Sequence, residues 1–150
     1  MFLAKTLHIL AAVIWVGGMF FAYMALRPAA ASLLEPPQRL SLWADVFSRF
    51  FFWVWISILT LLVSGYYMIF SHFGGFAGSG MHIHLMHTMG LVMMMIFMHV
   101  YFAPYKHLKK LVADNNFPEA AKNLNTIRKL VAINMSIGLL TFVAAEAILL

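Results

Sequence analysis

Long apolar stretches alternate along the chain with shorter polar connections, and most charged residues lie in or beside the connections. The apolar stretches cover residues 7–26, 50–70, 85–105 and 127–150. A helix needs about 20 apolar residues to cross the hydrocarbon core of a bilayer, which is about 30 Å thick, so each stretch is long enough for one span. The pattern predicts an all-α integral membrane protein in which one domain, residues 1–150, forms a four-helix bundle.

Composition supports a membrane location. Hydrophobic residues make up 63% of the 150 residues and charged residues only 10%, a balance that a water-soluble core of this size could not accommodate. The chain has no cysteine, so disulfides, thiolate ligands and iron–sulfur clusters are excluded, and metal ligands would be histidine, methionine or carboxylate. The net charge of +5 lies mainly at helix ends and in one connection, so we expect contact with membrane lipid and not with nucleic acid.

The basic residues predict how the helices are oriented. Residues 71–81, which join the second and third stretches, contain no Lys or Arg. The other two connections and their flanks hold Arg27, Arg39, Arg49, Lys106, Lys109, Lys110, Lys122, Arg128 and Lys129. Because positively charged connections stay in the cytoplasm, both termini are predicted to be periplasmic.

Histidines gather near the outer ends of the first and third spans. His8 precedes Arg27 by 19 residues, and His87 precedes Lys106 by the same number. At 1.5 Å per residue, the two imidazoles should lie at matching depth, with His84 one turn closer to the outer surface. Imidazoles at membrane depth are candidates for a functional site, because unpaired polar groups are costly there.

The third span carries a further histidine at a different level. His84, His87 and His99 fall within an arc of about 120° on the helix, so we expect all three to face the bundle interior. His84 and His99 are about 22 Å apart along the axis, which predicts an outer level and an inner level. Met95 and Met98 share this arc, whereas Met86, Met89 and Met93 point the opposite way and are predicted to face lipid or to fill space.

The first functional hypothesis is a haem b protein. His8 with His84 or His87 would hold one haem iron, and small residues on the face that includes Trp15 and Gly18 would leave room for a macrocycle or for a neighbouring helix. Iron held by two histidines transfers electrons and binds external ligands poorly. A second haem at His99 would create an electron path to a quinone or a redox protein, and the sequence leaves open whether this is an oxidoreductase.

The alternative is a copper-binding or copper-transport protein, because methionine and imidazole suit Cu(I). The capture residues would be Met81, His82, His84 and His87. His99, Met95 and Met98 would then pass the ion inward, and a homodimer would compensate for the small size of one bundle. A structural subunit, with histidines acting only as hydrogen-bond donors between helices, is the third interpretation.

The run LHILAAVIWVGG, with His8, Trp15, Gly17 and Gly18, resembles the membrane domains of the copper resistance protein D family. HLMHTMGLVMMMIFMHVYFAPYKHL and IRKLVAIN resemble small stand-alone members of that family. The chain is more distantly similar to the four-helix bacterial protoporphyrinogen oxidases, which bind haem b. Those oxidases place a lysine early in the third helix, and residues 81–105 contain none, so we do not expect that reaction. The resemblance implies a multi-pass protein of a bacterial inner membrane, linked to copper handling or to haem redox chemistry.

Overall fold

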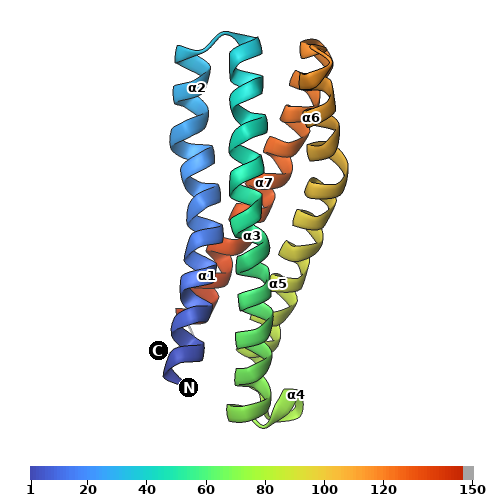
Figure 1. Cartoon of the computed structure of the whole chain (residues 1–150). Coiled ribbons are helices and arrows are strands. Elements are labelled where there is room, and N and C mark those ends of the chain that lie inside the picture. The colour runs from blue at the N-terminus through green and yellow to red at the C-terminus, as the bar shows by residue number, and fades with distance from the viewer. Residues whose placement is uncertain (147–150) are drawn as a thin grey trace.

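The computed structural model describes residues 1–146 and consists almost entirely of helices (Figure 1). Two of the helices are interrupted by a π-helical turn. In chain order the elements are α1 (Phe2–Phe21), a π-turn (Ala22–Leu26), α2 (Arg27–Leu33), α3 (Pro36–His72), α4 (Gly75–Gly78), α5 (Met81–Val100), a π-turn (Tyr101–Tyr105), α6 (Lys106–Ala113) and α7 (Phe117–Glu146).

These elements form four long rods, each long and apolar enough to cross a membrane. The rods cover Phe2–Leu33, Pro36–His72, Met81–Ala113 and Phe117–Ala145. The prediction of an all-α, multi-pass membrane protein is therefore confirmed. The first three apolar stretches of the sequence lie inside successive rods, whereas residues 147–150 of the fourth stretch lie outside the described residues.

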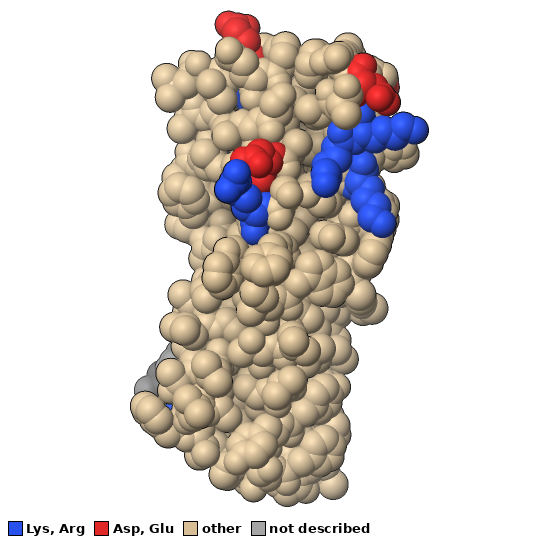
Figure 2. Space-filling view, in the orientation of Figure 1, with Lys and Arg blue, Asp and Glu red and all other residues tan. Residues whose placement is uncertain are grey.

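The rods are longer than the apolar stretches because their polar ends stay helical at one end of the bundle. The rod of α3 begins at Pro36, and a proline in the first helical turn sacrifices no intrahelical hydrogen bond. Most of the charged side chains visible in Figure 2 gather toward the end that carries α2 and α6. The other end holds α4 and the beginning of α1, and the turn there uses positive φ angles at Gly74 and Gly75.

The four rods pack as two pairs. α1 packs mainly against α3, and α5 against α7, while α7 also contacts α1 and α3. Small residues allow close approach: a Cβ atom at Gly18 would collide with the ring of Phe50, and a Cβ atom at Gly138 would lie 2.7 Å from a methyl group of Val16. Both glycines therefore set the spacing between rods.

Aromatic rings fill the middle of the bundle. The buried ring of Phe51 meets the rings of Phe97 and Tyr105 edge-on, at centroid distances of 5.3 Å and 4.9 Å, and stacks on Phe47 at 5.1 Å. Trp15 adds an edge contact to Phe97 at 6.1 Å. These contacts join the first three rods into one continuous core.

Candidate functional site

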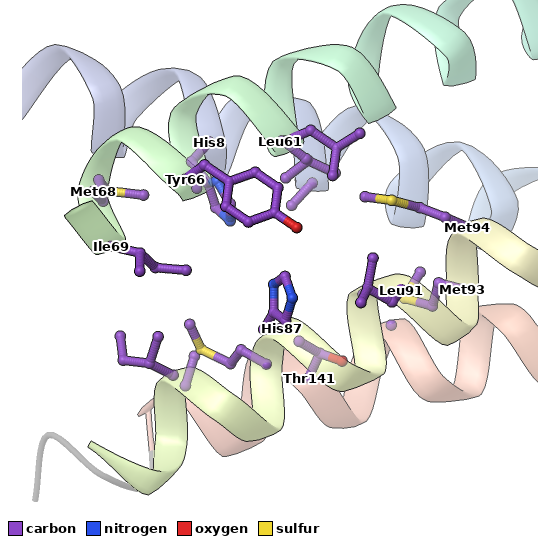
Figure 3. Close-up of a pocket in the computed structure, with 18 of the residues that line it drawn as sticks. His8, Leu61, Tyr66, Met68, Ile69, His87, Leu91, Met93, Met94 and Thr141 are labelled. Carbon is purple, nitrogen blue, oxygen red and sulfur yellow. The ribbon is translucent and has the colours of Figure 1, made fainter. Parts of the chain in front are cut away.

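A cavity of about 200 Å³ lies between the rods, in the half of the bundle that carries α4 (Figure 3). Its walls come from α1, α3, α5 and α7, so all four rods are needed to form it. Most of the lining is apolar. The side chains with metal-binding atoms are His8, His87, Met68, Met86, Met93 and Met94, and Tyr66 and Thr141 supply hydroxyl groups.

His8 enters the cavity from α1 and is oriented by a hydrogen bond. Its Nδ1 atom lies 2.9 Å from the hydroxyl oxygen of Ser64 on α3. The Ser64 hydroxyl donates its own hydrogen to the carbonyl oxygen of Thr60, so we assign the donor to His8 Nδ1–H. This tautomer leaves the lone pair on His8 Nε2 for a ligand. Gly65 gives the ring its space, because a Cβ atom there would lie only 3.2 Å from His8 Cε1.

His87 lines the same cavity from α5. Figure 3 shows its ring directed toward Tyr66, across the cavity from α5. The ring lies edge-on to Tyr66 at 5.5 Å and to Phe76 at 5.2 Å. His8 and His87, which the sequence predicted to lie at one level of the bundle, line a single cavity.

The methionines of α5 have the opposite orientation to the one predicted. Met86, Met93 and Met94 line the cavity, and Met93 is only 4% exposed. Met95 and Met98, which were predicted to face inward, are 58% and 41% exposed. This part of the sequence interpretation is wrong.

His99 also faces away from the interior, contrary to the prediction. Ile83 and Phe97 mark the buried face of α5, and at 100° per residue His87 lies about 40° from Ile83. His99 lies about 160° from Ile83 on the same helix, and its side chain is exposed. The arc of histidines therefore begins at the edge of the cavity and turns outward, so the inner level proposed for a second haem or for copper transfer does not form inside the bundle.

The M-H-I-H segment lies at the end of α5 nearest to α4, and Met81, His82 and His84 stay outside the cavity lining, whereas Ile83 belongs to it. Met81 is 82% exposed, and the ring of His84 stacks on Phe76 at 6.1 Å. His82 lies against its own helix terminus, since its ring would be 2.7 Å from a Cβ atom at Gly80. These residues are not brought together with His8 and His87, although they border the same end of the bundle.

Trp15 and Gly18 have packing roles in this structure. Trp15 is 2% exposed and lines the cavity, and its ring also packs edge-on against Phe97. At Gly18, the space proposed for a macrocycle is occupied by the ring of Phe50. The small face of α1 therefore accommodates α3 at that level.

The sequence analysis missed several residues of the site: Met68, Ser64, Gly65 and Tyr66 on α3, Met94 on α5 and Thr141 on α7. The clearest signal concerned α3. The available signal was a Ser-Gly pair near the end of an otherwise apolar span, since small and polar residues in membrane helices favour interhelical contact. That signal does not reveal which neighbouring helix they meet.

The donor atoms fit a soft metal ion better than a haem. Thioether sulfur and imidazole nitrogen are the ligands that Cu(I) prefers. Cofactor pockets typically enclose roughly 300–1,000 Å³, and this cavity, at about 200 Å³, is smaller. Within the described residues, no three His, Asp or Glu side chains gather in one place, so an ion held here would need methionine among its ligands.

A family model for copper resistance protein D matches residues 44–148. The chain belongs to the copper resistance protein D family. The matched range covers most of α3 and the whole of α5, whereas His8 and the Trp-x-Gly-Gly run of α1 precede it. Searches of curated proteins and of solved structures found no match. Membership identifies a copper-resistance membrane protein, and nothing in the comparisons supports haem.

Proposed function

We propose that this protein binds Cu(I) in the cavity between its four rods and takes part in copper handling in a bacterial inner membrane. His8 and His87 would supply imidazole ligands, and the cavity methionines would supply thioether ligands. The proposal rests on one observation above all: two histidines and four methionines from three rods line a single apolar cavity. Family membership points to the same metal.

The hydrogen bond of His8 supports a role in metal binding. Histidine ligands usually donate their second ring N–H to a neighbouring acceptor, which fixes the orientation of the ring and raises its basicity. The Ser64 hydroxyl, at 2.9 Å from Nδ1, provides that acceptor. His8 is thus held ready for a ligand at Nε2.

The position of the cavity favours uptake from the outer side. The basic connections lie at the opposite end of the bundle, and the positive-inside rule would place that end in the cytoplasm. Both termini and the cavity would then belong to the periplasmic half. Trp15 and the aromatic core close the bundle between the cavity and the basic end, so we propose binding and delivery of copper and not an open channel.

The test is a Cu(I) titration of the purified protein under reducing, anaerobic conditions, with a chromophoric Cu(I) chelator as competitor. His8→Ala and His87→Ala should each weaken binding by at least about tenfold, because each removes one ligand. His99→Ala provides the matched control on the exposed side of α5 and should bind like the wild type. X-ray absorption of the copper-loaded protein should report both nitrogen and sulfur neighbours.

Two outcomes would contradict the proposal. The first is wild-type affinity in both His8→Ala and His87→Ala, with folding of each variant verified by circular dichroism. The second is a purified protein that carries a b-type absorption spectrum lost in His8→Ala, which would restore the haem hypothesis in place of copper.

A further inference from the structure

A second cavity, of about 370 Å³, lies at the opposite end of the bundle from the His/Met cavity. It is enclosed by the rod of α1 and α2, by α3 and by α7. Three arginines line it, one from each of these rods: Arg27, Arg39 and Arg128. All three side chains are partly buried, although the sequence places them far apart.

Among the residues that the structure describes, none that lines this cavity is acidic. Within the described residues, the two ion pairs join Arg49 to Asp45 and Lys122 to Glu119, so neither involves the three arginines. Glu35 precedes Pro36 at the edge of the cavity, but its side chain is exposed and forms no ion pair with any residue that the structure describes. Three arginine side chains thus line one partly open cavity that has no carboxylate in its described lining, a charge arrangement that favours an anion.

Local structure holds one of these groups in place. The guanidinium carbon of Arg27 lies 4.9 Å from the centre of the Tyr23 ring. Both residues belong to or adjoin the π-turn Ala22–Leu26, and such turns change the direction of side chains and are frequent at functional sites. Stacking on Tyr23 orients Arg27 before any ligand arrives.

Apart from Tyr23 and Asn125, the remainder of the lining is apolar. Leu40, Trp43, Phe47, Leu124 and Val131 form walls that continue toward the middle of the bundle. A small inorganic anion would leave these walls without a partner, whereas a molecule with a charged head and a hydrocarbon tail would contact both parts. Basic pockets between membrane helices at the cytoplasmic side are typical binding sites for anionic lipid headgroups.

We propose that this cavity binds the phosphate group of an anionic phospholipid, with Arg27, Arg39 and Arg128 as the phosphate ligands and the apolar wall as the contact for an acyl chain. Bidentate hydrogen bonds from guanidinium groups suit phosphate oxygens. The site is independent of copper, because it shares no lining residue with the His/Met cavity.

The experiment measures lipid binding to the delipidated, detergent-solubilised protein by titration, with thermal unfolding as a second readout. The ligands are phosphatidylglycerol, phosphatidylcholine with the same acyl chains, and inorganic phosphate. Phosphatidylglycerol should bind and raise the Tm. Arg27→Gln, Arg39→Gln and Arg128→Gln should each weaken its binding roughly fivefold. Arg49→Gln is the matched control, since it makes the same change at the same end of the bundle but outside the cavity.

Each of the following results either supports or overturns the lipid-binding proposal. Selective binding of phosphatidylglycerol that depends on the three cavity arginines and not on Arg49 supports the proposal. Equal binding of phosphatidylcholine, or an equal loss in Arg49→Gln, overturns it. Equal stabilisation by inorganic phosphate assigns the arginines to a soluble phosphate compound and overturns the lipid assignment. Circular dichroism of every variant verifies that the fold is intact, and Arg128→Lys, which keeps the charge, should retain part of the lipid affinity.

Discussion

The hydrogen bond between His8 and Ser64 offers the sharpest test of the copper site. Replacing Ser64 with alanine removes the acceptor of His8 Nδ1–H, at 2.9 Å, without removing any atom that would touch the metal. Ser64 is buried, so water cannot easily take the place of its hydroxyl group. The imidazole of His8 then loses the contact that fixes its tautomer and its orientation.

The size of the effect follows from two estimates. Hydrogen bonds between side chains within membranes contribute roughly 0.6 kcal/mol on average, with a maximum near 1.7 kcal/mol. Loss of a hydrogen-bond partner behind a metal-binding histidine commonly lowers metal affinity by about 10-fold to 100-fold. The bond in this protein has an ordinary length and joins half-buried His8 to buried Ser64, so we expect Ser64→Ala to weaken Cu(I) binding by about tenfold, the lower end of that range, with little change in stoichiometry.

The assay is the same Cu(I) competition titration, run on Ser64→Ala and on Ser57→Ala. Ser57 is the matched control, because it is also a buried serine of α3 but has no hydrogen bond with His8. An affinity in Ser64→Ala equal to that in Ser57→Ala would refute the reasoning that the serine orients His8. A further perturbation, Gly65→Ala, should lower the affinity independently by pushing on His8 Cε1.

Two other predictions concern packing, and both are read from thermal unfolding in detergent. Gly18→Ala should destabilise the protein by roughly 1–3 kcal/mol, because its methyl group would overlap the Phe50 ring. In Gly17→Ala the methyl group enters open space, so the Tm should stay unchanged or rise slightly. Equal effects of the two substitutions would show that the two helices can shift apart. Asn134→Leu should stabilise the protein by roughly 1 kcal/mol, because in the described structure the buried Oδ1 atom of Asn134 has no hydrogen-bond partner. A lower Tm in that variant would mean that the amide has a partner in the native membrane.

The positions of the helices along the chain were predictable from the sequence because membrane insertion depends on local properties. A run of about 20 apolar residues is sufficient to identify a span, and the distribution of Lys and Arg predicts its orientation. Counting residues along two helices also predicted that His8 and His87 would lie near each other, and both line one cavity. Family membership could be recognised for the same reason, since it depends on the order of residues alone.

The sequence did not reveal which face of each helix points toward the bundle and which toward the lipid. Periodicity placed His87 and His99 on one arc of α5, but the arc could face the bundle or the lipid, and both environments accept apolar neighbours. Packing against α7 and against the Phe51 ring of α3 turned Met93 and Phe97 inward, and His99 outward as a consequence. The helix period is known from the sequence, whereas its phase relative to the other helices depends on contacts between distant segments.

Both cavities depend on this phase. Ser64 orients His8 across 56 residues of sequence, and three arginines that the chain separates line the second cavity together. Residue counts and hydropathy describe each span separately, because the bilayer acts on each helix as it inserts. The meeting of side chains from different spans is set by the mutual packing of all four rods, which no single segment of the chain encodes.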